Sequence, residues 1–200
     1  MIEELILVRH GETVSNVAGI AQGWGDSDLS PRGAEQVSRI GERLKRHEPD
    51  AIFSSPIGRA MTTAQAISDI LGLEVTTLEG LREMSYGTWE NRSFLDVRRE
   101  EKEAYERWIS DPDASSPKGE SHTQVRRRLE EAIESVSGVK RPVLVSHGTA
   151  IRIAVTALLN LPVMASMHFA QDNAAVNVFL RRPGRWVLKV WNDTTHCWDG

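Results

Sequence analysis

The segment Leu5-Ile6-Leu7-Val8-Arg9-His10-Gly11-Glu12-Thr13 decides the fold of this chain. Its first four residues form a short continuous apolar run, which is typical of a strand buried on both faces of a parallel sheet. Two further runs, at 51–54 and 142–146, have the same character. Ligands of open parallel sheets bind beyond the carboxyl ends of the strands, so the polar residues after each run indicate where a site lies.

Helical patterns separate these runs. In three segments apolar residues recur at spacings of three and four, which predicts helices with one buried face. These stripes are Ala34, Val37, Ile40 and Leu44; Ala60, Ala64, Ile67 and Leu71; and Val125, Leu129, Ala132, Ile133 and Val136. Residues 150–159 predict a buried helix, and 174–180 with 186–191 predict a closing hairpin around Pro183-Gly184.

Alternating strands and helices predict an α/β fold, here a three-layer α/β/α arrangement with a mostly parallel central sheet. The 200 residues (1–200) fit a single domain. Residues 86–118 break the alternation with charge runs and two tryptophans. We expect this segment to form a helical insertion over the C-terminal edge of the sheet.

Composition excludes several classes of protein. The chain has 24 Lys and Arg against 28 Asp and Glu, and its net charge of −4 argues against a broad surface for nucleic acid. No apolar run approaches the roughly 20 residues that span a bilayer, and the N-terminus is acidic where a signal peptide is basic. We therefore expect a cytoplasmic protein that binds neither membrane nor nucleic acid. The lone Cys197 excludes an internal disulfide and a cysteine zinc cluster.

Polar side chains follow the apolar runs on four separate segments. The segments are Arg9-His10-Gly11 with Asn16, Ser54-Ser55-Pro56 with Arg59, Arg82-Glu83 after 78–81, and Ser146-His147-Gly148. Arginine forks suit phosphate oxygens, a neutral imidazole can attack phosphorus, and a carboxyl group can protonate a leaving alcohol. Alone, each residue has an ordinary structural explanation, since a histidine after a strand is more often packed in the core, Arg9 could be an ion-pair partner, and Glu83 could be a surface carboxylate. Two His-Gly pairs directly after strands favour a common site.

No phosphate-binding P-loop and no HExxH zinc motif occurs in the chain. We therefore expect no cofactor and no metal, with protein cations stabilising the charge of a phosphoryl group. The expected partner is a small phosphorylated metabolite, and nothing in the sequence indicates an oligomeric state.

These motifs resemble the histidine phosphatase superfamily, in its cofactor-dependent phosphoglycerate mutase branch and small phosphatase type. The resemblance extends from Leu5 to about Trp191. It rests on Leu7–Thr13 with Asn16; Ser54-Ser55-Pro56 with Arg59; Leu81-Arg82-Glu83 with Gly87 and Trp89-Glu90; Gly119-Glu120-Ser121; and Ser146-His147-Gly148. The third motif departs from the family at Asn91, where glycine is usual. Asparagine tolerates the left-handed conformation, so we expect a small effect.

The resemblance implies a role for each matching residue. His10 would be the nucleophile and form a phosphohistidine. Glu83 would donate a proton to the leaving group and then activate water. Arg9, Arg59 and His147 would bind the phosphoryl group, and the substrate contacts would be Asn16, Gln22, Gly23 and Gly148.

Several functions remain open at this stage. A metal-independent phosphomonoesterase leads, and a 2,3-bisphosphoglycerate-dependent phosphoglycerate mutase would use the same residues. A serine hydrolase based on Ser146 lacks the glycine two residues earlier, where Leu144 stands. A non-catalytic phosphate-binding module should have lost one of the chemical residues, and all are present. Specificity is expected to lie in 86–118 and near Gln22.

Two smaller expectations concern aromatic residues. His122 follows a helix cap formed by Ser121 and Gln124, and we expect its ring to be exposed. The tryptophans 24, 89 and 108 could either wall the substrate pocket or pack the insertion on the sheet.

Overall fold

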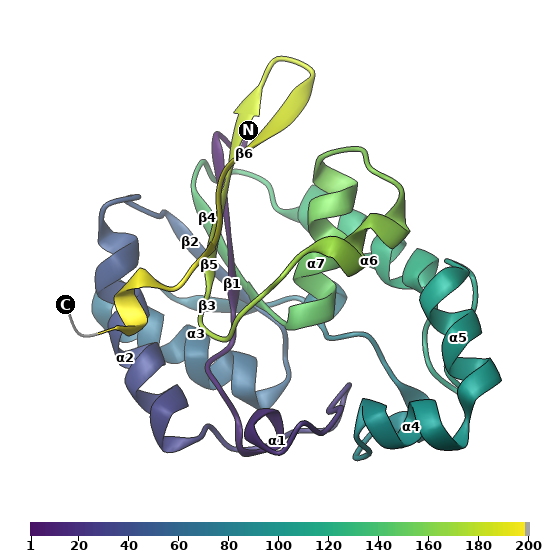
Figure 1. The fold of residues 1–200 in the computed structure, drawn as a ribbon. Helices are drawn as coiled ribbons and strands as arrows, with labels where there is room; N and C mark the ends of the chain where they lie inside the picture. The colour runs from purple at the N-terminus through teal and green to yellow at the C-terminus, as the bar shows by residue number, and fades with distance from the viewer. Residues whose placement is uncertain (199–200) are drawn as a thin grey trace.

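The computed structural model describes residues 1–198 and contains a six-stranded central sheet (Figure 1). The strands are β1 (Glu4–Arg9), β2 (Ala51–Ser54), β3 (Val75–Thr77), β4 (Pro142–Ser146), β5 (Val176–Arg182) and β6 (Arg185–Asp193). Their order is β3-β2-β4-β1-β5-β6. The first four are parallel, whereas β5 and β6 continue the sheet as an antiparallel hairpin. The predicted mostly parallel sheet and its closing hairpin are confirmed.

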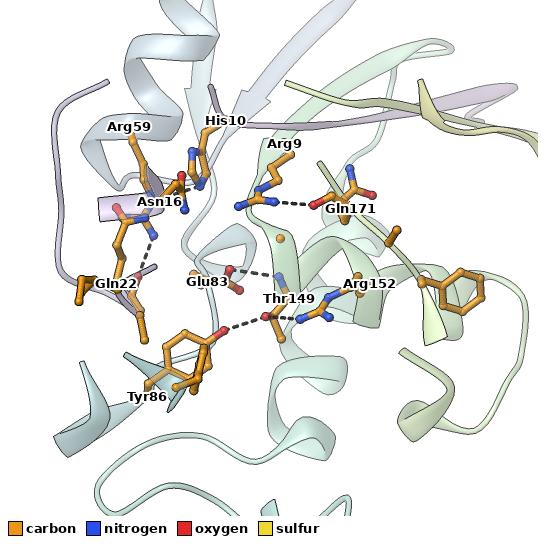
Figure 2. A pocket seen from close by; sticks show the side chains of 17 residues that line it. Arg9, His10, Asn16, Gln22, Arg59, Glu83, Tyr86, Thr149, Arg152 and Gln171 are labelled. Carbon is orange, nitrogen blue, oxygen red and sulfur yellow. Dashed lines mark hydrogen bonds between the residues drawn. The ribbon is translucent and has the colours of Figure 1, made fainter. Parts of the chain in front are cut away.

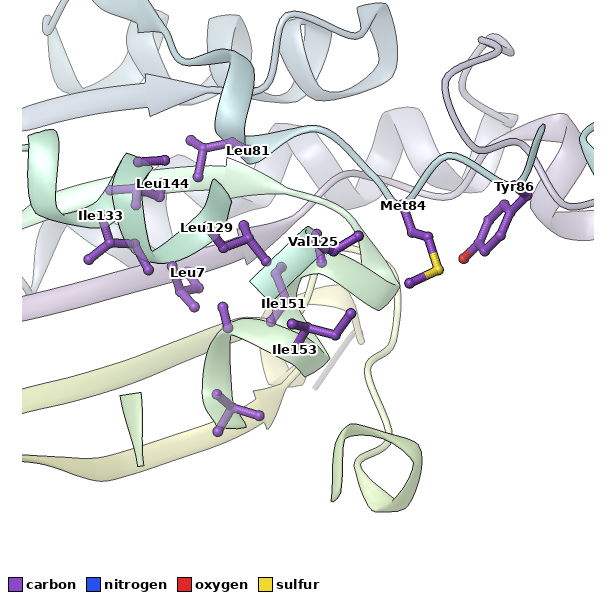
Figure 3. Packing of buried hydrophobic residues seen from close by; sticks show 14 of the residues in the cluster. Leu7, Leu81, Met84, Tyr86, Val125, Leu129, Ile133, Leu144, Ile151 and Ile153 are labelled. Carbon is purple, nitrogen blue, oxygen red and sulfur yellow. The ribbon is translucent and has the colours of Figure 1, made fainter. Parts of the chain in front are cut away.

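Helices cover both faces of the sheet. Helices α2 (Pro31–Lys45) and α3 (Gly58–Leu71) lie on one face, and α6 (His122–Ser135) and α7 (Gly148–Leu158) lie on the other (Figure 1). Alternate residues of β1 divide between the two layers, because Ile6 and Val8 pack with α2 and α3 while Leu5 and Leu7 pack with α6 and α7. Figure 3 shows the hydrophobic cluster in which the sheet packs against α6 and α7. The predicted three-layer arrangement is therefore confirmed.

The segment between β3 and α6 contains the short helices η1 (Glu79–Leu81), η2 (Gly87–Trp89), α4 (Phe94–Glu100) and α5 (Lys102–Ser110). Trp89 and Trp108 are buried here among the rings of Tyr86, Phe94 and Tyr105. These two tryptophans thus pack the insertion. The remaining short elements are α1 (Val14–Val17), η3 (Val163–His168) and η4 (Thr195–Cys197).

The structure corrects two details of the sequence analysis. Residues 78–81, which the sequence analysis grouped with the strand ends, mostly form the short helix η1, and the unpredicted strand β3 lies just before them. The expectation that His122 is exposed is wrong, because its ring is fully buried with its centroid 5.2 Å from that of Trp108. Asn91 does adopt the left-handed conformation, with a φ of 64°. Within residues 1–198, no helix has both the length and the apolar character that crossing a membrane requires.

Candidate active site

A pocket of about 300 Å³ lies beyond the carboxyl end of β1 and beside the start of α7 (Figure 2). Eight of the predicted site residues line it: Arg9, His10, Asn16, Gln22, Gly23, Arg59, Glu83 and Gly148. His147 is fully buried beside them, with its ring centroid 5.2 Å from that of His10. The fold therefore brings the four predicted segments together in one place.

The hydrogen bonds of His10 determine which ring nitrogen is available for chemistry. Its Nδ1 lies 2.7 Å from the carbonyl oxygen of Gly11, and a carbonyl only accepts, so Nδ1 bears the proton. The other nitrogen, Nε2, has a lone pair and accepts a bond of 3.2 Å from Arg59 Nε. Burial, together with the charges of Arg9 and Arg59, holds the pKa of His10 well below its usual range. The ring is thus neutral and has the lone pair that a nucleophile needs.

Two buried guanidinium groups flank His10. Arg59, at the start of α3, donates to the carbonyl oxygens of Gly25 at 2.6 Å and Gly23 at 2.9 Å. Arg9, at the end of β1, donates to the carbonyl of Gln171, while its Nε is buried with no hydrogen-bond partner among the described residues. Burial lowers the pKa of both guanidinium groups. A buried cation with an unmet donor can bind an oxyanion.

The ring of His147 lies at the end of β4. Its Nε2 is 2.8 Å from the hydroxyl of Ser55, and its Nδ1 has no partner among residues 1–198. Burial lowers the pKa of His147 well below its usual range, and the charge of Arg59 adds to this effect. The neighbouring Ser146 donates its hydroxyl to the carbonyl of Leu81 at 2.7 Å. That hydroxyl is therefore engaged away from the pocket, which disfavours a serine nucleophile.

The carboxylate of Glu83 lies at the N-terminus of α7, where backbone N–H groups have no helical partners. It accepts from the N–H of Ala150 at 2.9 Å, of Met84 at 2.9 Å and of Thr149 at 3.1 Å. These bonds fix a buried carboxyl group at the wall of the pocket.

An arginine that the sequence analysis did not identify supports the backbone around Glu83. Arg128, on α6, donates to the carbonyl oxygens of Gly80, Arg82 and Glu83 at distances of 2.8 to 2.9 Å. Glu120 holds this guanidinium through a bond of 2.8 Å. Glu120 therefore positions the segment rather than entering the pocket.

Asn16 and Gln22 differ in how their amides are held. The Oδ1 of Asn16 accepts from the backbone and the hydroxyl of Thr13 and from the Nδ2 of Asn173, at 3.0 to 3.1 Å. These three donors leave the amide NH₂ of Asn16 as the group available to the pocket. The Oε1 of Gln22 is buried and has no partner among the described residues.

Gly148 permits a close approach to Arg9. A Cβ built on Gly148 would lie 3.2 Å from Arg9 Cζ, which is closer than most side-chain contacts. The glycine therefore leaves room for the guanidinium group beside the start of α7.

Tyr86 and Phe94, from the segment 86–118 in which specificity was expected, also line the pocket. The sequence reasoning missed Thr149, Arg152, Phe169 and Gln171. For Arg152 a signal existed, because it is the only charged residue in the apolar sequence of α7. Gln171 comes from the loop before β5 and offered no pattern. Trp24 lies beside the site, half-exposed, with its indole N–H donating to the carbonyl of Glu83 at 2.9 Å.

Comparison with known proteins finds relatives over nearly the whole chain. The model of the histidine phosphatase superfamily (branch 1) matches residues 5–194. The "Probable phosphoglycerate mutase GpmB" of Yersinia pestis is 33% identical over 202 residues, covering 96% of this chain and 94% of that protein. The α-ribazole phosphatase of Shigella flexneri superimposes with a TM-score of 0.85 at 29% identity, covering 96% of each chain. A phosphoserine phosphatase mutant of Entamoeba histolytica, in complex with phosphoserine, gives 0.84 at 31% identity, covering 96% of this chain and 98% of that chain.

Proposed function

Because the chain belongs to the histidine phosphatase superfamily, branch 1, we propose that it hydrolyses phosphate monoesters of small metabolites without a metal, through a phosphohistidine on His10. The observation that supports this most strongly is the state of the His10 ring. Its Nδ1–H donates to Gly11, so the Nε2 lone pair faces a pocket lined by arginines. A neutral nucleophile among permanent cations is what attack on an anionic ester requires.

In the first step, the Nε2 of His10 forms a bond to phosphorus while the bond from phosphorus to the ester oxygen breaks. Arg9 and Arg59 balance the charge on the non-bridging oxygens, and the NH₂ of Asn16 donates to one of them. The Arg59 Nε, which donates to His10 Nε2 in the free protein, is then available to the phosphoryl group. Glu83 transfers a proton to the departing alcohol oxygen.

In the second step, a water molecule attacks phosphorus and the bond between phosphorus and Nε2 breaks. Glu83, now a carboxylate, takes the proton that the water loses. Inorganic phosphate leaves, and both His10 and Glu83 return to their initial states. His147 stays beside the phosphoryl group as a neutral ring, and its one N–H group donates a hydrogen bond.

The proposal is tested with a chromogenic aryl phosphate. We expect hydrolysis that persists after dialysis against EDTA, inhibition by vanadate, and loss of turnover in His10→Ala. Full activity of His10→Ala, or loss of wild-type activity in EDTA that a divalent metal restores, would contradict the proposal.

A phosphoglycerate mutase is the second candidate, favoured by the name of the relative that is 33% identical. Hydrolysis is preferred because the two structural relatives compared above have phosphatase names. The two activities separate when the protein receives 3-phosphoglycerate with 2,3-bisphosphoglycerate. Free phosphate supports hydrolysis, whereas accumulation of 2-phosphoglycerate without free phosphate supports the mutase.

A further inference from the structure

The pocket has two ends (Figure 2). Arg9, His10, Arg59 and Asn16 form the end at which the proposed chemistry occurs, which we call the phosphate end. Tyr86, Thr149 and Arg152 form the distal end. The proposed reaction uses no residue of the distal end, although that end contains a third guanidinium group.

We propose that Arg152 binds a carboxylate of the substrate, so that the protein acts on phosphate esters of small hydroxy acids. This inference rests on the proposed phosphatase function and defines its substrate class. Arg152 is the residue that would select for the second anionic group.

The surroundings of Arg152 indicate a binding role. Its Nη2 donates to the Thr149 hydroxyl at 2.9 Å, and this hydroxyl lies 2.7 Å from that of Tyr86. Burial and the nearby Glu83 raise the pKa of Tyr86, so the phenol is neutral and supplies no counter-charge. No carboxylate among residues 1–198 forms an ion pair with Arg152.

Outside the pocket, two arginines that are buried to a similar degree each have an acidic partner. Arg128 contacts Glu120 at 2.8 Å, and Arg43 contacts Asp193 at 2.6 Å. The guanidinium group of Arg152 is held in place by the neutral hydroxyl group of Thr149 and has no acidic partner within the described residues. It is therefore suited to bind an anionic group of the ligand.

The balance of charge in the pocket favours a carboxylate over a second phosphate. Three arginines line the pocket, and among residues 1–198 Glu83 is the only carboxyl group that lines it. Arg9 and Arg59 lie at the phosphate end, where Asp26 is 3.5 Å from Arg59 and offsets part of its charge. At the distal end, the single positive charge of Arg152 balances a carboxylate, which has one negative charge. A second phosphate would bring two negative charges, and Arg152 could balance only one of them.

Two unsatisfied amides favour a hydroxylated substrate. Gln22 Oε1 and both polar side-chain atoms of Gln171 are buried with no partner in the described part of the chain. Both residues line the pocket. Buried amides without partners cost free energy, and substrate hydroxyl groups would satisfy them.

A matched pair of substrates tests the inference. 3-Phosphoglycerate and glycerol 3-phosphate differ in having a carboxylate or a CH₂OH group at one carbon. For the wild type we expect kcat/KM to be about 10- to 100-fold higher for 3-phosphoglycerate, the range of one charge-assisted hydrogen-bonded contact. In Arg152→Met this ratio should fall to near unity, and Arg152→Lys should restore part of it. Arg127→Met is the matched control, because Arg127 is exposed on α6 and should keep the wild-type ratio.

Several outcomes would overturn the inference. A wild-type ratio below about threefold, or a ratio unchanged in Arg152→Met, excludes a carboxylate site at Arg152. An Arg152-dependent preference for a bisphosphate over 3-phosphoglycerate would show that the second anion is a phosphate. Thermal melting of each variant identifies any that fails to fold.

The proposed function and the substrate class fail differently. If the wild type does not hydrolyse an aryl phosphate, the proposed function is wrong. Calorimetric titration of His10→Ala with both glycerol derivatives then measures discrimination without turnover. Tighter binding of 3-phosphoglycerate that disappears when Arg152→Met is added still supports the carboxylate site, and equal binding refutes it.

Discussion

Replacing Glu83 by glutamine tests the assignment of the proton donor. Glutamine keeps the shape of the side chain and one acceptor oxygen, but it cannot supply a proton to the leaving group. The proton matters most when the alcohol is a poor leaving group. Kcat/KM reports the steps up to release of the alcohol, so it isolates the donor role from the later activation of water.

The structure sets the expected magnitudes. The Glu83 carboxylate accepts three backbone N–H bonds, and the glutamine oxygen can keep those of Met84 and Ala150. The amide NH₂ then faces the N–H of Thr149, donor against donor. We expect a loss of about 1–3 kcal/mol in unfolding free energy from this mismatch. Loss of a general acid should lower kcat/KM for an alkyl phosphate by about 10²- to 10⁴-fold.

The assay compares an alkyl phosphate with p-nitrophenyl phosphate, whose phenolate leaves without a proton. For the aryl ester we expect Glu83→Gln to lose no more than about tenfold in kcat/KM, well below the loss of a general acid. Thermal melting shows whether the variant remains folded at the assay temperature. Equal losses for both esters would refute the reasoning, because Glu83 would then act only by positioning α7.

Three further substitutions give distinct expected results. Burial lowers the pKa of His122 to about 4, so between pH 6.5 and 4 the unfolded chain binds a proton there that the folded chain does not. The folded state therefore becomes less stable as the pH is lowered. Between pH 6.5 and 4, urea unfolding should show that the unfolding free energy of the wild type decreases by about 3 kcal/mol more than that of His122→Leu. Gly148→Ala should lower kcat/KM by about tenfold to hundredfold, because its Cβ would press on Arg9. Gly33→Ala should instead lower unfolding free energy by about 3 kcal/mol, because its Cβ would lie 1.9 Å from the Glu12 carbonyl oxygen.

Each of these expectations has a contrary result. A difference between His122→Leu and the wild type that is constant with pH would mean that His122 titrates alike in both states. Wild-type kcat/KM in Gly148→Ala would mean that the position of Arg9 is not critical. A wild-type melting temperature for Gly33→Ala would contradict the close approach of α2 to Glu12.

The sheet and the main helices could be predicted because their residues are buried in regular patterns. Strands β1 and β4 are apolar on both sides, since alternate residues face two different helical layers. Strand β3 gave no such signal. It has three residues, Val75–Thr77, which are largely exposed, and it forms by pairing with β2 at the edge of the sheet.

The positions of three site segments could be inferred from the ends of β1, β2 and β4, whereas Glu83 follows η1 rather than a strand. The contacts that support these segments could not be inferred. The contacts of Ser55 with His147, of Asn173 with Asn16 and of Arg128 with the Glu83 segment join parts of the chain far apart in sequence. Such contacts depend on packing, which local patterns do not report.

His122 shows the limit of using polarity to predict exposure. The residue begins α6 beneath the aromatic side chains of the insertion, where Trp108 covers it. Both of its ring nitrogens lack a partner within residues 1–198. Tertiary packing at this point outweighs the preference of a neutral imidazole for water.

The central claim is that His10 Nε2 forms a covalent bond to phosphorus. Rapid mixing of the wild type with a ³²P-labelled phosphate monoester, followed by an alkaline quench and peptide mapping, tests this most directly. We predict a labelled peptide that contains His10, with the base-stable and acid-labile behaviour of a phosphohistidine, and no label in His10→Ala. Label on any other residue, or turnover of His10→Ala at the wild-type rate, would contradict the account.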